Sequence, residues 1–385
     1  MPHRFGAVVI GAGSFGAWTA RELRRRGLAV TLLDAYGPGN SRSSSGGESR
    51  IIRMGYGPDD IYTRWAMRDL ELWRELFAQT GQPLFHRTGV LWFARTQAQD
   101  PYNSASLDAF RRLSVPHQTL TSADLKRLYP QIALDERITW ALLEPESGVL
   151  MARRAVAAVV EQAIREGVEY RCSKVAPRSG EGRLEAVLTP GGDSISAETF
   201  VFCCGPWLGK VFPELLGDRI FPTRQEVFFF GLPPGDQRLG PPALPTWIDL
   251  GEEAYGMPDL EGRGLKAAID RHGPAFDPDT GSRLPTAEGA EGVRRYVARR
   301  FPALQGAPVL EARVCQYENT SSGDFLLDRH PTLRNVWLAG GGSGHGFKHG
   351  PSVGDYMTKL ILEGGPVEPR FSLVTKQSVQ KRQIF

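Results

Sequence analysis

The sequence has no apolar run near the roughly 20 residues that a membrane-spanning helix requires. Its charges are nearly balanced at a net +3, and the basic residues are scattered rather than gathered in a stripe with aromatics. Both absences count against a membrane or a nucleic acid as a partner. The first apolar strand begins near Ala7 and leaves no room for a signal peptide, so we expect a cytoplasmic protein.

Cysteine is also scarce, with four residues in 385. Cys172, Cys203, Cys204 and Cys315 lack the paired spacing of a zinc site, and four in this length do not form a disulfide scaffold. The H-E-x-x-H pattern and the Walker A loop are absent as well, so we expect no metal. Cys203 and Cys204 are interpreted as packing residues, whereas Cys315 is either a buried structural thiol or a reactive one.

What the sequence does contain begins with a nucleotide-binding pattern. Val8–Ile10 is a short apolar run, followed at G-x-G-x-x-G spacing by Gly11, Gly13 and Gly16. A helix is predicted over 17–26 and a second apolar run over 29–33 ends at Asp34. The glycines permit a tight turn, close approach of a diphosphate and close packing of the helix on the strand. Asp34 can accept hydrogen bonds from a ribose hydroxyl, which favours NAD or FAD over NADP.

A second unit of strand, glycine loop and helix lies near the other end of the chain. Asn335–Ala339 reads as a buried strand, residues 340–346 are rich in glycine, and a helix is predicted over 351–361. Backbone N–H groups at such a loop and helix start bind electron-rich groups. FAD is long enough to need two such units, so the pair favours FAD over NAD.

Between these two units, a region of mixed helices and strands is followed by a region of short strands. Helices are predicted over 59–79, 104–130 and 152–166, and strands over 85–94, 168–175 and 200–204. From 221 to 316, short aromatic strands are separated by proline and glycine, which predicts an antiparallel sheet. We therefore expect an α/β (α+β) fold with two interleaved domains. They are a Rossmann-like FAD-binding domain of residues 1–85, 144–217 and 317–385, and an antiparallel-sheet substrate domain of residues 86–143 and 218–316.

Two arginines follow a segment that composition alone would identify as a flexible linker, residues 41–49. Arg50 and Arg53 are three residues apart and separated by isoleucines. This spacing predicts that both guanidinium groups lie on one side of a helical turn, where they can bind an anion. A solvated pair of surface arginines is the alternative.

With these motifs in view, the chain resembles the monomeric sarcosine oxidase family of FAD-dependent amine oxidases, in the DAO superfamily, over nearly its whole length. The resemblance rests on Gly11–Asp34, Arg50–Arg53, Leu142–Leu150, Gly264–Lys266, Cys315, Asp328–Pro331 and Ser343–Lys348. It implies a small amino or imino acid with a free carboxylate as substrate, O2 as a second partner, and a monomer.

The resemblance also implies individual roles. Cys315 resembles the cysteine that forms a thioether with the flavin 8α-methyl group, and Lys266 the lysine that faces flavin N5 through water and assists O2 reduction. Arg53 and Lys348 resemble the pair that clamps the substrate carboxylate, and Tyr255 a tyrosine of the substrate cavity. The implied cofactor-binding set is Gly11, Gly13, Ser14, Gly16, Asp34, Ser43, Arg50, Val175, Cys315, Gly342, Gly344, Gly346, Phe347 and Lys348.

The chain departs from the family pattern at two places. Sarcosine-specific members carry a pair of histidines where this sequence has Ser45 and Gly46. A cavity histidine after the lysine corresponds to Asp270 here, and His272 falls two residues further on. An acid at the amine end suits a cationic, cyclic or larger substrate, as in nikD-like or N-methyl amino acid oxidases.

The reaction that the resemblance implies is oxidation of the C–N bond of a secondary or cyclic amino acid. Hydride passes from the α-carbon to FAD, and O2 is reduced to H2O2. The alternative is an FAD-dependent dehydrogenase on the same scaffold that passes its electrons to a carrier other than O2.

Overall fold

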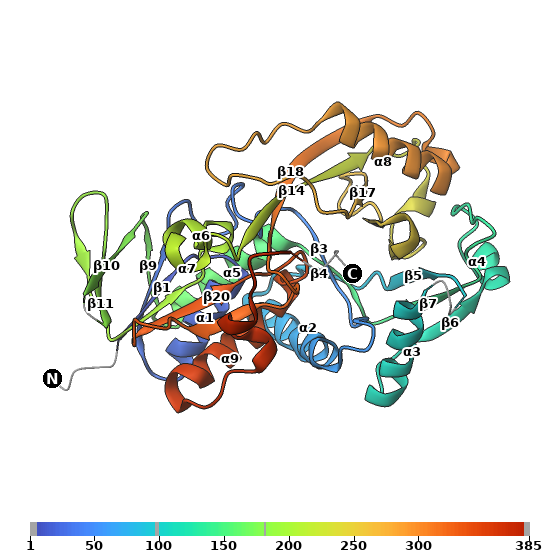
Figure 1. The fold of residues 1–385 in the computed structure, drawn as a ribbon. Coiled ribbons are helices and arrows are strands. Elements are labelled where there is room, and N and C mark those ends of the chain that lie inside the picture. Colours follow the sequence, from blue (N-terminus) through green and yellow to red (C-terminus); the bar gives the residue numbers. More distant parts are fainter. Residues whose placement is uncertain (1–5, 97–99, 181, 381–385) are drawn as a thin grey trace.

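A computed structural model gives the structure and describes residues 6–96, 100–180 and 182–380. The chain forms two lobes, one built on a six-stranded sheet and the other on an eight-stranded sheet (Figure 1). Within those residues, no helix combines the length and the apolar character needed to cross a bilayer.

The six-stranded sheet brings together strands from both ends of the chain, as the blue β1 and the red-orange β20 show in Figure 1. Neighbouring strands run parallel except β19, which pairs antiparallel with β20. In spatial order they are β19 (Leu326–Arg329), β20 (Val336–Gly340), β13 (Thr199–Phe202), β1 (Gly6–Ile10), β2 (Ala29–Asp34) and β9 (Glu169–Cys172).

Both faces of this sheet are covered, which explains its continuous apolar runs. Ala7 and Val9 of β1 pack in the core that contains the helices of one face, while Val8 and Ile10 pack in a separate core on the other. The first face carries α1 (Ser14–Arg25), α5 (Ala152–Arg165) and α9 (Gly350–Glu363), with α2 (Asp60–Thr80) beside them. The second carries α6 (Leu208–Val211), α7 (Pro213–Leu216) and a small sheet of β10 (Ala176–Gly180), β11 (Arg183–Leu188) and β12 (Ser194–Ile195).

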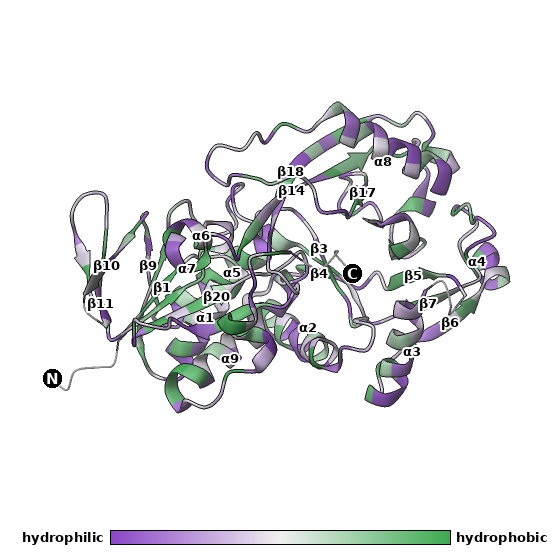
Figure 2. Ribbon diagram, viewed as in Figure 1, coloured by the Kyte–Doolittle hydropathy of each residue, from purple (hydrophilic) through white to green (hydrophobic). Residues whose placement is uncertain are grey.

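The eight-stranded sheet of the other lobe is antiparallel except where β15 runs parallel to β5. Its order is β18 (Val309–Asn319), β14 (Phe221–Phe230), β17 (Leu265–Ile269), β16 (Ala254–Met257), β15 (Thr246–Asp249), β5 (Val90–Ala94), β7 (Trp140–Glu144) and β6 (Gln118–Thr121). Figure 2 colours β5 as hydrophobic, in keeping with its complete burial. The helices of this lobe are α3 (Pro101–Leu113), α4 (Ser122–Leu128) and α8 (Ala287–Arg300).

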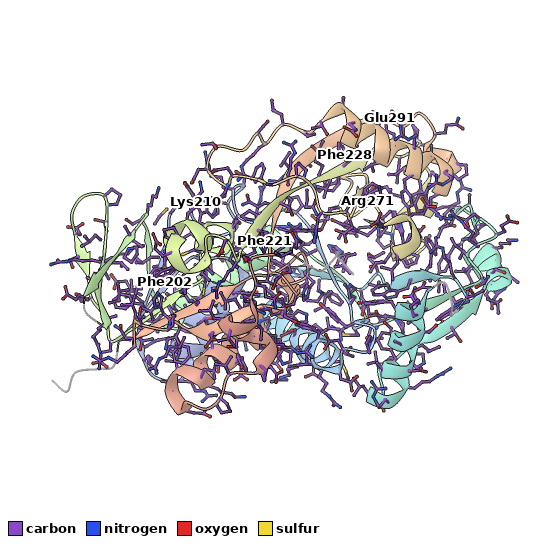
Figure 3. The ribbon with its side chains drawn as sticks, in the orientation of Figure 1. Phe202, Lys210, Phe221, Phe228, Arg271 and Glu291 are labelled. Atoms are coloured by element: carbon purple, nitrogen blue, oxygen red, sulfur yellow. The ribbon has the colours of Figure 1, made fainter. Side chains whose placement is uncertain are left out.

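Two long paired strands, β14 and β18, run from one lobe into the other. Figure 3 places Phe221, the first residue of β14, toward the lobe that contains Phe202 of β13, and Phe228 further out in the other lobe. A third small sheet, of β3 (Arg50–Ile52), β8 (Gly148–Leu150) and β4 (Phe85–His86), lies on the path between the lobes. The α/β (α+β) fold class is confirmed.

Two local predictions were wrong. Residues 104–130 are not continuously helical, because β6 pairs with β7 between α3 and α4. Ser114 in the left-handed conformation and Pro116 end the helix there. Arg50 and Arg53 are not on a helical turn either, since Ile51 and Ile52 pair in a strand with β8. β-Branched residues favour that extended backbone.

Candidate active site

The two glycine-containing units of the chain meet at one cavity, called the nucleotide cavity below. Ser14 Oγ, at the start of α1, donates a 2.7 Å hydrogen bond to the carbonyl oxygen of Phe347, at the end of the second glycine loop. Eleven predicted cofactor-binding residues line this cavity. They are Gly11, Gly13, Ser14, Asp34, Ser43, Arg50, Val175, Gly342, Gly344, Gly346 and Phe347.

The turn between β1 and α1 requires glycine at two points. Gly11 has φ +106°, and a Cβ there would lie 2.2 Å from the carbonyl oxygen of Cys203. A Cβ on Gly16 would lie 1.8 Å from the carbonyl oxygen of Gly11, so the helix packs directly on the turn. Gly16 is not among the residues that line the cavity. Its lack of a Cβ lets α1 pack against the turn, which is the role that the third glycine has in this motif.

Asp34 lies at the end of β2, where its carboxylate organises the cavity wall. Oδ2 accepts the N–H of Ala12 at 2.7 Å, and Oδ1 accepts the N–H groups of Tyr36 and Gly37, both at 2.8 Å. Burial raises the pKa of Asp34, and the three backbone donors oppose that rise. Oδ2, with one backbone donor, keeps a lone pair for a ribose hydroxyl.

A buried acid in this cavity was not predicted from the sequence. Glu318, on β18, lines the nucleotide cavity, and its Oε1 accepts a long 3.3 Å hydrogen bond from the Gly342 N–H. Its Oε2 is buried without a partner among the described residues. Burial raises the pKa of Glu318 to about 7. A buried oxygen without a partner is costly, so this carboxyl fits a ligand with hydroxyl groups in the cavity.

A second cavity, called the charged cavity below, continues from the first. Arg50, Tyr317 and Phe347 line both. The predicted catalytic and clamp residues Arg53, Lys348, Tyr255 and Asp270 line the charged cavity, and Cys315 lines it too. Cationic and acidic side chains thus line a single space, which complements a ligand that carries both a carboxylate and an amine.

Arg53 is buried, at 6% exposed, and fixed from several sides. Its guanidinium lies 4.6 Å from the ring centre of Tyr56 and 4.8 Å from that of Trp92, and Nη1 donates to the carbonyl oxygen of Gly55. Glu144 holds the loop that carries Arg53, because it accepts the N–H groups of Met54 at 2.7 Å and Gly55 at 3.0 Å. Glu144 lies in the motif Leu142–Leu150 but had no predicted role.

Lys348 is 3% exposed and comes from the short helical turn η5 (Phe347–His349). Its Nζ donates to Tyr56 Oη at 2.7 Å and to the carbonyl oxygen of His345 at 3.0 Å. Burial lowers the pKa of Lys348 well below its usual value, and the positive charge of Arg53 adds to this. Two of the three ammonium donors have protein partners among the described residues, which leaves one for a ligand in the cavity.

Asp270 follows β17 and faces the charged cavity beside two tyrosines. Its Oδ1 accepts a 2.7 Å hydrogen bond from Tyr317 Oη. Burial raises the pKa of Asp270 to about 7, although the Tyr317 hydrogen bond and Arg53 act against the rise. Tyr317 was not predicted, yet it stands two residues after Cys315 on β18, and strand alternation would have placed it on the same side. His272 instead lies against Gln380, with 2.6 Å between His272 Nδ1 and Gln380 Nε2.

Lys266 lines a third, small cavity together with Arg50 and Cys315. It is 2% exposed, and its Nζ donates to the carbonyl oxygen of Ser49 at 3.0 Å and to Ser49 Oγ at 3.2 Å. Burial lowers the pKa of Lys266 to about 7, and the positive charge of Arg50 contributes to this. The amine therefore changes charge near neutral pH, and it does so beside Cys315.

A nucleotide cavity at the carboxyl ends of parallel strands, continuing into a charged cavity under an antiparallel sheet, is the arrangement of a dinucleotide-dependent oxidoreductase. In the part of the chain that the structure describes, no cluster of three or more His, Cys, Asp or Glu side chains is placed to hold a metal.

The sequence profile of the family described as FAD dependent oxidoreductase matches residues 7–360. Monomeric sarcosine oxidase of Bacillus sp. (strain B-0618) is 30% identical over 400 aligned positions, covering 100% of both chains. Human peroxisomal sarcosine oxidase is 33% identical, covering 94% of this chain and 93% of its own. L-Proline dehydrogenase from P. horikoshii has the same fold, with a TM-score of 0.83, 22% identity, and 97% and 98% of the two chains covered. The chain belongs to the DAO family of FAD-dependent oxidoreductases.

Proposed function

We propose that this enzyme oxidises the C–N bond of a secondary or cyclic amino acid. FAD supplies the acceptor for a hydride from the substrate α-carbon, and O2 then takes up two electrons and two protons to leave as H2O2. The imine product is released for hydrolysis or further use. The observation that carries the proposal is the charged cavity, where Arg53 and Lys348 share a space with Asp270 beside the nucleotide cavity.

The protein's own part in this reaction is binding and orientation. Arg53 and Lys348 both bind the substrate carboxylate, which fixes the α-carbon toward the shared wall of the two cavities. Asp270, assisted by Tyr317 and Tyr255, faces the amine. An acid there suits a cationic, cyclic or larger substrate more than it suits sarcosine, the substrate in the names of the two relatives.

Lys266 and Cys315 have roles toward the cofactor rather than the substrate. We assign to Lys266 the electrostatic stabilisation of negative charge during O2 reduction, because a buried ammonium acts strongly at low dielectric. We assign to Cys315 a covalent thioether to the flavin, because its sulfur contacts the Arg50 guanidinium and the residue lines the charged cavity. The remaining predicted residues that line the nucleotide cavity hold the dinucleotide.

The domain limits follow the two sheets. We assign residues 1–85, 144–217 and 317–385 to the FAD-binding domain, since all six strands of the first sheet come from these ranges. Residues 86–143 and 218–316 are assigned to the substrate domain, with β7 and β18 reaching across its limits.

The test is a panel of N-methyl, cyclic and primary amino acids added to the purified yellow protein without oxygen. A good substrate should bleach the flavin absorbance, and readmitted O2 should restore it with one H2O2 per turnover. N-Acetyl amino acids, which keep the carboxylate but lack a basic amine, serve as controls. Bleaching without peroxide on reoxidation would favour the dehydrogenase alternative. If no amino acid of the panel with a basic amine bleaches the flavin, the proposal is contradicted.

A further inference from the structure

A buried chain of hydrogen bonds leads from Lys348 into the interior, away from the charged cavity. Lys348 Nζ donates to Tyr56 Oη, which lies 2.7 Å from His349 Nε2. His349 Nδ1 lies 2.7 Å from Asp69 Oδ2. Asp69 and His349 are 0% exposed. The chain therefore links the proposed carboxylate clamp to an acid that water does not reach.

The pattern of donors and acceptors fixes a direction for this chain. An ammonium group only donates, so the Tyr56 oxygen accepts from Lys348 and its single proton goes to His349 Nε2. Neutral His349 then carries its own proton on Nδ1, which it donates to the Asp69 carboxylate. His345 Nδ1, at 3.2 Å from Tyr56 Oη, is the longer alternative acceptor. In the shorter path, the Tyr56 hydroxyl and the His349 imidazole both turn the negative end of their dipole toward Lys348.

The surroundings explain why Lys348 needs this support. Its burial and the positive charge of Arg53 both favour the neutral amine, whereas the negative charges of Asp69 and Glu144 act in the opposite direction. Glu144 is occupied by backbone N–H groups of the Arg53 loop. His349 does not add positive charge, because burial and the nearby Lys348, His345 and Arg53 lower its pKa well below the usual value.

We propose that Asp69, His349 and Tyr56 are positioning residues that hold the proton on Lys348, so that the clamp stays cationic in the absence of substrate. The inference rests on the proposed function, in which Lys348 binds the substrate carboxylate. Asp69 also has a structural role, because its Oδ1 accepts the N–H of Ser352 at 2.8 Å and the Ser352 hydroxyl at 2.7 Å near the start of α9. A useful test therefore needs a readout that loss of structure would not change.

The readout is the pH dependence of binding of a carboxylate inhibitor without an amine, followed by flavin absorbance between pH 6 and 10. Tyr56→Phe keeps the aromatic ring but interrupts the hydrogen bonds between Lys348 and His349. In this variant, binding of the inhibitor should weaken at least tenfold at pH 8 and recover toward pH 6 as Lys348 takes up a proton. His349→Leu should show the same shift. Thr358→Val, which alters a buried residue of α9 outside this hydrogen-bond path, should keep the parent profile.

Each result decides a separate question. Parent-like pH profiles in Tyr56→Phe would overturn the inference, and so would a uniform weakening at every pH. If His349→Leu does not fold, Tyr56→Phe decides alone. A parent protein that binds no carboxylate at all would contradict the proposed function instead. The uncharged amide of the same inhibitor should bind all variants alike, because it does not need the cationic lysine.

Discussion

Arg50 Nη2 lies 3.1 Å from Cys315 Sγ, and the two residues come from different sheets, β3 and β18. The contact places a permanent cation on the one cysteine that faces both the charged cavity and the small Lys266 cavity. A cysteine attacks an electrophilic carbon as its thiolate, and this guanidinium lies within contact distance of the sulfur. This pairing separates Cys315 from the other three cysteines in a way that sequence spacing does not.

The first prediction concerns this sulfur. After precipitation with acid, the yellow colour of the parent protein should stay in the pellet, and denatured protein should remain fluorescent. Cys315→Ser should release the flavin into the supernatant. Cys172→Ser, at an exposed cysteine, should behave as the parent does. Colour in the supernatant of the parent itself would mean that no thioether forms.

The second prediction concerns Lys266. Lys266→Met should slow reoxidation by O2 by about 10²-fold or more, the scale for loss of one fixed charge-stabilising group, and change reduction by substrate far less. Since the pKa of Lys266 is about 7, its ammonium is lost as pH rises, so parent reoxidation should slow above about pH 7. Stopped-flow absorbance measures both half-reactions. Lys376→Met, which alters another buried lysine, is the control. If Lys266→Met slows both half-reactions equally, Lys266 does not have the role assigned to it.

The third prediction tests the carboxylate clamp. Arg53→Ala should weaken carboxylate inhibitors by about 2–5 kcal/mol, the scale for removing one partner of a buried charge pair. The neutral amide of the same inhibitor should lose much less, since it never paired with the guanidinium. Titration followed by flavin absorbance gives both affinities. An unchanged affinity for the carboxylate would place the clamp elsewhere.

The fourth prediction is a pH dependence with the opposite sign to that of Lys266. The pKa of Asp270 is about 7, so its carboxylate forms as pH rises, and affinity for a cationic amine should increase through that range. Asp270→Asn should flatten this limb and weaken such ligands by about 1.5–3 kcal/mol, the scale for a hydrogen bond to a charged group. Tyr317→Phe should move the limb to higher pH, because it removes a donor that stabilises the carboxylate. If the rise of affinity with pH is unchanged in Asp270→Asn, a group other than Asp270 causes it.

The sequence was sufficient to predict the framework because its signals are local. The G-x-G-x-x-G turn, Asp34 and the second glycine loop each depend on neighbours in the chain, and all three meet at the nucleotide cavity. The Arg50 and Arg53 segment was assigned the wrong backbone, since pairing with β8, about 100 residues away, decides its conformation. The spacing of neighbouring residues carries no information about a partner strand so far along the chain.

The residues that sequence analysis missed share one property, which is that their partners are distant in the chain. Glu144 reaches back to Met54, and Tyr317 reaches back to Asp270. His349 and Asp69 come together only when α2 and α9 pack. An acid alone is usually a surface residue, so the folded contacts are what distinguish Glu144 and Asp69 from other acids.

The final prediction concerns Glu318, whose buried carboxyl has one oxygen without a partner among the described residues. Such a group lowers the stability of the protein without cofactor, so Glu318→Leu should raise the free energy of unfolding of the apoprotein by about 1–3 kcal/mol. The same change should weaken FAD binding about tenfold or more, because a hydroxyl of the cofactor then has no carboxyl to bind in the nucleotide cavity. Both are measured in a Cys315→Ser background, by thermal unfolding and by titration with FAD.

A purely structural glutamate would give the reverse pattern, since its loss would destabilise the apoprotein and leave the affinity for FAD close to that of the parent. Glu318→Gln keeps a hydrogen-bonding group of the same size and should retain most of the FAD affinity, which separates loss of the polar contact from a change of shape. Glu311→Leu, on the same strand but outside the nucleotide cavity, controls for loss of a carboxylate on β18. Opposite effects on stability and on cofactor affinity at position 318 alone would identify a residue kept for binding at the expense of stability.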